Sequence, residues 1–254
     1  MTVAIIGFGN MGKAIAAALA KSFDVAVFDR HANRQAAAKK IGVSWLTTLS
    51  DASRYNFIII AVKPIDVPKL AGQIVLPESV ILISIAAGVN IKTLQRLFKH
   101  KKCVRVMTNL GLTAGHGIAA WKQAGLSRSD LLKTQKLLNA ISENFEADSE
   151  DAIDKVTAIS GSGPAYFFYL AQAMERSAMA LGFPPLVARK LVEETFLGAA
   201  ELQKGVGYEQ LITRIASKKG TTEAALEVFK KNGMEKIVTK AIRAAYLRAR
   251  ELGA

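Results

Sequence analysis

Three short stretches of this chain are almost purely apolar, and they limit the possible folds more than any other feature. They are Phe57–Ala61, Val80–Ile85 and Val104–Met107. A half-exposed strand alternates apolar with polar residues, so a continuous apolar run predicts a strand buried on both faces. Parallel sheets covered by helices bury their strands in this way. We therefore expect such a sheet in the first half of the chain.

Strand and helix patterns alternate before these runs. Val3–Ile6 and Val25–Phe28 are apolar stretches rich in β-branched residues, and helical patterns over Met11–Ala20 and Asn33–Lys40 follow them. This alternation predicts a doubly wound α/β domain of the Rossmann type.

The pattern changes near residue 150, and from Pro164 on the chain carries long, alanine-rich helical patterns and no strand pattern. One apolar face repeats at steps of three and four residues, which is the helical period. Its residues are Phe167, Leu170, Ala171, Met174, Ala178 and Leu181. We predict an α/β domain over residues 1–150 and an all-helical dimerisation domain over residues 151–254. The helical domain is expected to pack against a second subunit, and a self-sufficient helical bundle is the alternative.

A glycine-rich motif stands between the first predicted strand and the first predicted helix. Its sequence, Gly7-Phe8-Gly9-Asn10-Met11-Gly12, fits G-x-G-x-x-G. In this pattern the first glycine makes a tight turn, the second lets the backbone approach a pyrophosphate, and the third lets the helix pack closely on the strand. The free N–H groups at the helix start bind the pyrophosphate. The motif therefore predicts a dinucleotide-binding site rather than a mere turn.

The end of the second predicted strand carries both an acid and two bases. Asp29 stands about 20 residues after the motif, where a carboxylate can bind the ribose 2′-hydroxyl of NAD. Arg30 and Arg34 follow, and a guanidinium there can hold the 2′-phosphate of NADP. We favour NADPH as the cofactor, with NADH left open.

Two segments that follow the buried strands extend the expected cofactor site. Ala61-Val62-Lys63-Pro64 follows one strand, and Ser84–Gly88, which includes Ala86, follows the next. In this fold ligands bind outside the carboxyl ends of the strands. We therefore expect Ala61, Val62, Lys63, Pro64 and Ala86 at the rim of the cofactor site.

In this order, Gly-x-Gly-Asn-Met-Gly, Ala-Val-Lys-Pro and Ser-Ile-Ala-Ala-Gly resemble the pyrroline-5-carboxylate reductases. In the second half, Glu150–Thr157 leads into Ser160–Tyr166, a specific signature of that family, and residues 219–222 stand where the family carries its Gly-Gly-Thr-Thr or Gly-Gly-Ala-Thr loop. The resemblance covers essentially the whole chain. It implies hydride transfer from NAD(P)H to a small cyclic imine acid, giving L-proline.

The loop Ser217–Thr222 precedes a helix predicted to start near Glu223, and backbone N–H groups at a helix start suit a carboxylate. The resemblance implies that Thr222 is the catalytic residue, with its hydroxyl bonded to the ring nitrogen of the substrate. It further implies a set of substrate-binding residues, namely Ser217, Gly220, Thr221 and Glu150. The alternatives are that the threonines only cap the helix and that Glu150 is a surface carboxylate.

Three departures from the family pattern leave the exact imine substrate open. Leu110-Gly111 replaces a Thr-Pro pair, Lys219 replaces the first glycine of the substrate loop, and Arg214 stands where some members carry Asn. The resemblance also implies that the helical half of one subunit completes the active site of another, in a homodimer or a larger ring of dimers.

The formal net charge of +13 makes nucleic acid one conceivable partner. However, the basic residues are spread along the chain without a tail or a nucleic-acid motif, and a phosphorylated cofactor explains the sign equally well. We expect no nucleic-acid partner, no metal and, without an apolar run of about 18 residues, no membrane span. Cys103 is the single cysteine, which excludes an intrachain disulfide and fits the cytoplasm. Cys103 is expected to be a small core residue.

Three rival functions remain at this point. A β-hydroxyacid dehydrogenase is disfavoured, because the Lys-x-x-x-Asn pattern of that class does not occur after about residue 160. An imine reductase with a shifted substrate and a cofactor-binding paralogue without turnover both stay open.

Overall fold

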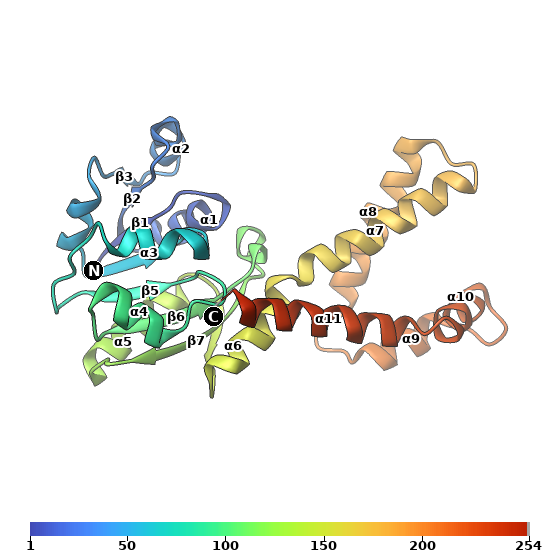
Figure 1. Ribbon diagram of the computed structural model, residues 1–254. Coiled ribbons are helices and arrows are strands. Elements are labelled where there is room, and N and C mark those ends of the chain that lie inside the picture. Colours follow the sequence, from blue (N-terminus) through green and yellow to red (C-terminus); the bar gives the residue numbers. More distant parts are fainter. Residues whose placement is uncertain (253–254) are drawn as a thin grey trace. The chain divides into compact units, whose positions relative to one another are not determined.

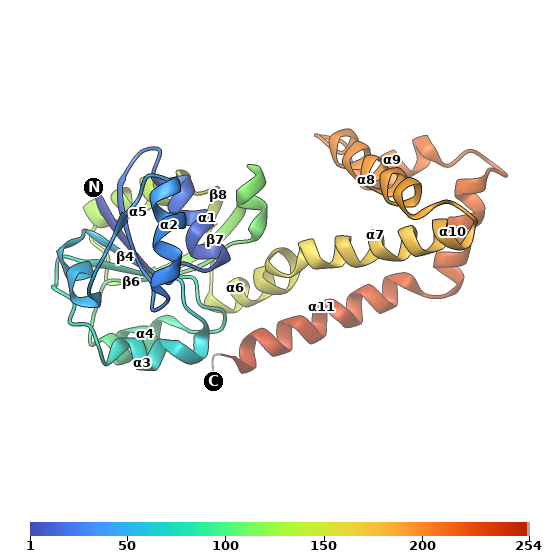
Figure 2. The ribbon, with the colours of Figure 1, turned by 90° about the horizontal axis from the view of Figure 1, so that it is seen from above.

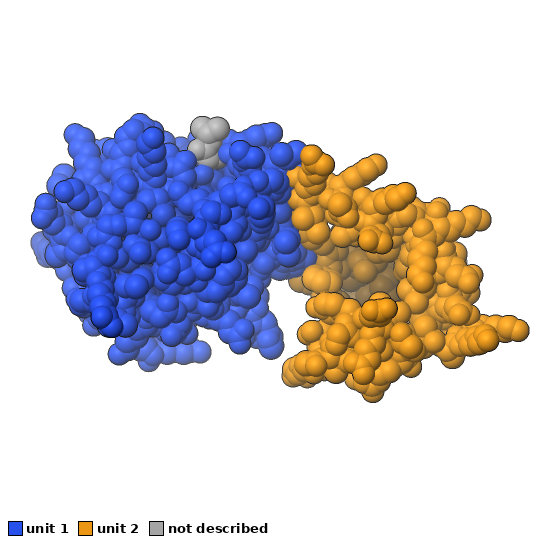
Figure 3. Space-filling view, turned by 90° about the horizontal axis from the view of Figure 1, so that it is seen from below, with its two compact units in different colours: residues 1–164, 244–254 blue, residues 165–243 orange. Residues whose placement is uncertain are grey.

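The computed structural model describes residues 1–252. The contacts of the chain define two compact units, shown in Figure 3. Unit 1 consists of Met1–Pro164 together with the chain from Ala244 on, and unit 2 is Ala165–Arg243. The domain limits predicted from the sequence, 1–150 and 151–254, stay a prediction.

Unit 1 is built on one eight-stranded sheet with the order β3-β2-β1-β4-β5-β6-β7-β8 within the described chain. The strands are β1 (Thr2–Ile6), β2 (Asp24–Phe28), β3 (Ser44–Trp45), β4 (Phe57–Ile60), β5 (Ile81–Ser84), β6 (Cys103–Met107), β7 (Ile118–Ala124) and β8 (Glu143–Glu146). All neighbouring strands are parallel except β6 and β7. The predicted α/β class and doubly wound sheet are confirmed, and β3, β7 and β8 were not predicted.

Helices cover both faces of this sheet, as Figure 2 shows. One face carries α1 (Asn10–Leu19), α2 (Gln35–Lys40) and α5 (Arg128–Asn139), and the other carries α3 (Val67–Ala71), α4 (Ile91–Phe98) and α6 (Glu150–Val156). The connecting turns are η1 (Ala32–Arg34), η2 (Leu49–Arg54), η3 (Pro64–Asp66), η4 (Leu110–Ala114) and the π-helical turn η5 (Thr157–Gly161). All four residues of β4 are fully buried, as its apolar run predicts.

Cys103 lies in the core beneath α4, and burial raises the pKa of its thiol to about 12. The thiol therefore stays protonated at neutral pH, and the residue is a packed core residue as expected.

The chain leaves unit 1 through α7 (Gly163–Ala180) and returns through α11 (Met234–Glu251), both visible in Figure 1. Between them lie α8 (Pro185–Leu202), α9 (Tyr208–Ile215) and α10 (Thr221–Lys231). After residue 146 the described chain contains no strand, so the predicted all-helical character of the second half is confirmed. Back in unit 1, the Tyr246 hydroxyl donates a hydrogen bond to Asp151, and Ala249 is buried.

Within unit 2, α7 packs on α8. The ring of Phe196 lies 6.2 Å from that of Phe167 and 6.3 Å from that of Phe168, measured between centroids. Large apolar side chains nevertheless remain exposed, with Leu181 at 81% and Leu186 at 84% exposure in the single chain. Among the described helices, none combines the length and apolar character needed to cross a bilayer.

Candidate functional site

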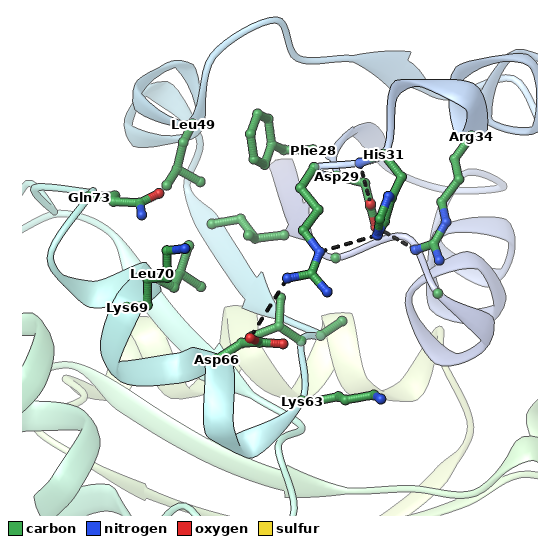
Figure 4. Close-up of a pocket in the computed structure, with 16 residues that line it drawn as sticks. Phe28, Asp29, His31, Arg34, Leu49, Lys63, Asp66, Lys69, Leu70 and Gln73 are labelled. Carbon is green, nitrogen blue, oxygen red and sulfur yellow. Dashed lines mark hydrogen bonds and ion pairs between the residues drawn. The ribbon is translucent and has the colours of Figure 1, made fainter.

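A pocket of about 380 Å³ opens at the carboxyl ends of β1, β2 and β4. At this point the strand order changes direction, because β2 and β3 lie on one side of β1 and β4 and the later strands lie on the other. Figure 4 shows its lining residues, among them Asp29, Lys63 and Asp66. Its lining residues are Ile6, Gly7, Gly9, Phe28, Asp29, Arg30, His31, Arg34, Leu49, Ala61, Val62, Lys63, Asp66, Lys69, Leu70 and Gln73. In doubly wound sheets this reversal is the place where ligands bind.

The three glycines of the turn between β1 and α1 each meet a different constraint. Gly7 has a φ of +101°, and a Cβ there would lie 2.5 Å from the Ala61 carbonyl oxygen. A Cβ at Gly12 would lie 1.9 Å from the Gly7 carbonyl oxygen. At Gly9 a Cβ would meet no protein atom within 4 Å. Gly7 and Gly12 are therefore fixed by the fold, whereas the space beside Gly9 is open to a ligand.

The N-terminus of α1 points its first N–H groups at this space. Its N-cap is Gly9, which provides no side-chain cap, and the first helical hydrogen bond runs from the Lys13 N–H to the Gly9 carbonyl at 2.8 Å. The N–H groups of residues 10–12 precede that bond, so they lack helical acceptors. Such groups at a helix start suit a diphosphate, and the open space at Gly9 fits one.

The carboxylate of Asp29 is held by the protein itself. Oδ2 accepts hydrogen bonds from the Phe8 N–H at 2.6 Å and from Arg34 Nη1 at 2.7 Å, and Oδ1 accepts one from the His31 N–H at 2.9 Å. Burial raises the pKa of Asp29, but the hydrogen bonds from His31 and Phe8 and the charge of Arg34 outweigh it, so the pKa is lowered overall. Asp29 therefore stays ionised and links the glycine turn to the end of β2.

Arg30 is placed differently from Arg34. Its Nη1 lies 3.9 Å from Asp66 Oδ1, its Nε donates to His31 Nε2 at 3.2 Å, and 71% of its side chain is exposed. Lys63 and Lys69 line the same pocket. The lining of the pocket thus carries more positive than negative side chains. The guanidinium of Arg30 makes only a long ion pair with Asp66, so it can bind a phosphate.

The structure brings half of the predicted cofactor residues into the lining of this pocket. These are Gly7, Gly9, Arg30, Ala61, Val62 and Lys63. Phe8, Asn10, Met11, Gly12 and Pro64 are close to them in the chain but outside the lining, and Ala86 stands on the separate loop between β5 and α4. Phe8 turns its ring into the core against Trp45, and Ala86 is buried with its N–H donating to Ser84 Oγ at 3.2 Å.

Glu150, predicted to lie near the substrate, is the first residue of α6, and its carboxylate is bound by the protein. Oε1 accepts from the Ile91 N–H at 2.8 Å and lies 3.3 Å from Arg105 Nη1. The guanidinium of Arg105 also pairs with Asp154, and Arg105 is 2% exposed. Glu150 is therefore no free surface carboxylate, and its role towards a substrate stays a prediction.

The predicted substrate loop belongs to unit 2 and is described within that unit. Gly220 is the N-cap of α10, so Thr221 and Thr222 occupy its first two helical positions and do not cap it. A Cβ at Gly220 would lie 2.3 Å from Ser217 Oγ and 2.9 Å from the Ser217 carbonyl oxygen, so a larger residue there would force the loop to shift. The catalytic role of Thr222 stays a prediction.

Two of the three departures from the family pattern, Lys219 and Gly111, stand in turns whose backbone the structure defines, and the structure gives no reason for Arg214. Lys219 has a φ of +60°, the left-handed region that favours glycine, and its N–H donates to Glu223 at 2.5 Å. Gly111 donates its N–H to Asn109 Oδ1 at 3.0 Å, and a Cβ there would lie 2.8 Å from the His116 carbonyl oxygen. The turn after β6 thus requires glycine where the family pattern has proline.

Several pocket residues were not predicted. Leu49, Leu70 and Gln73 come from η2, α3 and the chain just after α3, and in Figure 4 they lie across the pocket from Asp29 and Arg34. Nothing in the spacing of these three residues places them at the pocket. Arg105 is a charged residue inside an apolar run, which is the only signal in the sequence for its part in the site, and we did not predict that part from it.

Comparisons with known proteins agree over both halves of the chain. The family model described as pyrroline-5-carboxylate reductase dimerisation matches residues 150–252, and the model described as NADP oxidoreductase, coenzyme F420-dependent, matches residues 2–88. The chain is 30% identical to the pyrroline-5-carboxylate reductase of Aquifex aeolicus, covering 99% of this chain and 97% of that protein. It is 31% identical to the reductase of that name from Pisum sativum, covering 99% and 96%.

Solved structures show the same fold. The pyrroline-5-carboxylate reductase of Coxiella burnetii matches with a TM-score of 0.85 and 27% identity, over 99% of this chain and 98% of that one. The Plasmodium falciparum pyrroline carboxylate reductase, crystallised with NADP bound, matches with a TM-score of 0.87 and 24% identity, over 100% and 98%.

Proposed function

The chain belongs to the pyrroline-5-carboxylate reductase family, and from this premise we propose that it reduces pyrroline-5-carboxylate to L-proline with NADPH. The observation that carries the proposal is the similarity to named reductases over essentially the full length of both chains. The pocket at the glycine turn supplies the matching physical site. The enzyme is thus an oxidoreductase that acts on a CH–NH group.

The pocket holds the cofactor through three features of the first unit. The N–H groups at the start of α1 bind the diphosphate, and the open space at Gly9 lets it approach. Arg30 binds the 2′-phosphate of NADPH, because the carboxylate of Asp29 is already occupied by Arg34 and two backbone N–H groups. When bound, NADPH supplies the hydride.

The substrate is held by the loop of the second unit. The N–H groups at the start of α10 bind its carboxylate, with Thr221, Gly220 and Ser217 shaping the loop. The hydroxyl oxygen of Thr222 accepts a hydrogen bond from the protonated ring nitrogen and orients the imine carbon towards the hydride donor. A protonated imine is already a good electrophile, so positioning rather than a strong acid is what the protein must provide.

The chain forms homo-oligomers, because its second half is the dimerisation region of the family. We propose a dimer, or a ring of dimers, in which the helical half of one subunit completes the site on the α/β half of another. The exposed apolar side chains of α7 and α8 support this arrangement, since a lone chain would leave them in water.

The function is tested by following NADPH oxidation with purified protein and pyrroline-5-carboxylate. Turnover by the wild type and a loss of at least about tenfold in kcat/KM for Thr222→Val are expected. Thr239→Val is the matched control, because that hydroxyl only bonds to the Glu235 carbonyl one turn earlier, at 2.9 Å. Tight NADPH binding without turnover would instead indicate a paralogue that binds the cofactor and catalyses nothing.

Cofactor choice is tested with the same assay. We expect a higher kcat/KM with NADPH than with NADH, and a loss of that preference in Arg30→Ala. Arg54→Ala is the control, since this guanidinium is 82% exposed and pairs with Asp51 outside the pocket lining. An unchanged preference in Arg30→Ala would refute the assignment of the 2′-phosphate to that residue.

A related cyclic imine acid is the second candidate substrate. The observation in its favour is that Lys219 and Gly111 stand where the family pattern carries Gly and Pro. Measuring kcat/KM on five- and six-membered cyclic imine carboxylates decides between the two, because the true substrate gives the higher value.

A further inference from the structure

We infer that Glu150 and Arg105 are positioning residues, which fix the loop between β5 and α4 against α6 so that the nicotinamide side of the site keeps its shape. This inference rests on the proposed function, because that loop contains Ala86 and follows β5 at the carboxyl edge of the sheet. This positioning role is separate from the substrate-binding role that the family resemblance implies for Glu150.

Glu150 joins three elements through one oxygen. Its Oε1 accepts from the N–H of Ile91, the first residue of α4, at 2.8 Å, and lies 3.3 Å from Arg105 Nη1 on β6. Glu150 itself begins α6. Because Ile91 ends the loop that starts after β5, the carboxylate anchors the far end of that loop to the neighbouring strand and helix.

The cation in this network is almost fully enclosed. The side chain of Arg105 is 3% exposed, and its Nη2 pairs with Asp154 one turn further along α6. Buried ion pairs add little net stability compared with apolar residues that replace the whole pair, since desolvation offsets much of their attraction. A forked guanidinium held by two carboxylates instead fixes direction, because it satisfies both only in one orientation of α6 on β6.

The end of α6 is fastened to the same edge of the sheet. The helix continues into η5, where Ser160 Oγ accepts from Asn109 Nδ2 at 2.8 Å, and a Cβ on Gly161 would lie 3.4 Å from Met107 Sδ. The segment 150–161 is therefore attached to the α4 start at one end and to the end of β6 at the other. Its π-helical turn is a feature frequent at functional sites.

The test compares Glu150→Ala and Glu150→Gln with the wild type. Alanine removes the acceptor for the Ile91 N–H, whereas glutamine keeps an oxygen there and loses only the charge facing Arg105. We expect kcat to fall roughly tenfold or more in Glu150→Ala, because small misplacements at a reacting centre cost this much. Glu150→Gln should recover part of that loss, with the Kd for NADPH within about twofold in both, since the pocket at the glycine turn is untouched.

Lys155→Gln is the matched control. It breaks an ion pair on the exposed side of the same helix, where Lys155 Nζ lies 2.7 Å from Asp151 Oδ2. It should leave kcat unchanged. Should Glu150→Ala fail to fold, Glu150→Gln and Arg105→Lys carry the test, and both should have a lower kcat than the wild type and Lys155→Gln.

Amide hydrogen exchange over residues 85–91 gives a readout that does not depend on turnover. We expect roughly tenfold faster exchange in Glu150→Ala and near wild-type exchange in Glu150→Gln and Lys155→Gln. Wild-type kcat or unchanged exchange in Glu150→Ala would overturn the inference, as would an equal loss of kcat in Lys155→Gln. If the wild type reduces no cyclic imine acid, the proposed function fails, and the exchange rates alone then decide whether Glu150 holds the loop.

Discussion

Gly9 and Gly12 stand three residues apart in one turn, but an added methyl group would meet opposite surroundings at the two positions. At Gly12 it would lie 1.9 Å from the Gly7 carbonyl oxygen, which is a backbone atom that cannot move aside cheaply. At Gly9 it would have no protein neighbour within 4 Å. We therefore predict that Gly12→Ala damages the fold and that Gly9→Ala damages cofactor binding.

The stability change follows from these contacts. Forcing a methyl group into a packed site lowers the free energy of unfolding by about 1–3 kcal/mol. At Gly12 we expect the upper end of this range, which exceeds the roughly 1 kcal/mol by which alanine is preferred over glycine in a helix. A net loss of about 2 kcal/mol lowers the Tm of a chain of this size by about 4–8 °C. Gly9 has a φ of −76°, which alanine adopts readily. In Gly9→Ala the loss of stability from a weaker N-cap is therefore nearly offset by the gain from a less flexible unfolded chain.

The binding change follows from the open space at Gly9. A methyl group there holds the diphosphate away from the N–H groups of α1, and we expect the Kd for NADPH to rise about tenfold to a hundredfold, equivalent to about 1.4–2.8 kcal/mol. Gly207→Ala is the matched control, because Gly207 is also an N-cap glycine, with a φ of −67° and open space around its Cβ.

Thermal unfolding and titration calorimetry with NADPH measure both effects on the same preparations. A Kd for Gly9→Ala within twofold of the Gly207→Ala value would refute the placement of the diphosphate. A Tm for Gly9→Ala as low as that of Gly12→Ala would refute the claim that the fold leaves this space empty.

Three further predictions concern other parts of the chain. The lowered pKa of Asp29 means that its carboxylate stabilises the fold above its unfolded pKa of about 3.9, and this contribution is lost as pH falls through the folded pKa. Asp29→Asn should therefore lower the Tm by several degrees at pH 7 and by less near pH 3. An equal loss of Tm at both pH values would contradict the ion pair with Arg34. Gly111→Pro removes the N–H donated to Asn109 and introduces a Cβ near a carbonyl oxygen, so thermal unfolding should show a loss of about 1–3 kcal/mol; an unchanged Tm would mean that the turn adapts. Light scattering should give a mass of at least two chains, and Leu186→Glu, which charges a side chain that is 84% exposed in the single chain, should weaken that association; a wild-type monomer would contradict the oligomer.

The sequence predicts the centre of the fold well because the signal there is local. The run at β4 is apolar throughout, and those at β5 and β6 are apolar except for Ser84 and Arg105, which is the composition that a strand buried on both faces needs. β7 (Ile118–Ala124) escaped prediction because it ends in Lys, Gln and Ala, and β8 (Glu143–Glu146) because an edge strand carries polar and charged residues.

The same distinction separates the predicted from the unpredicted parts of the site. The glycine turn could be located because its three glycines form one short motif between a strand pattern and a helix pattern, and the clash that a Cβ at Gly12 would make with the Gly7 carbonyl oxygen lies within that motif. The contacts of Glu150 could not, because they join residues 59 and 45 positions apart, and no spacing in the sequence records such a pairing. Long-range pairs of this kind become visible only once the sheet order is known.

Unit 2 begins and ends on unit 1, since the chain leaves after Pro164 and is back in that unit from Ala244 on. The returning segment is held there by the Tyr246–Asp151 hydrogen bond and the buried Ala249. A protease that cuts a loop of unit 2 would therefore produce two fragments, and each of them would contain a part of unit 1. The nicked protein should run as one particle under native conditions and come apart only in denaturant.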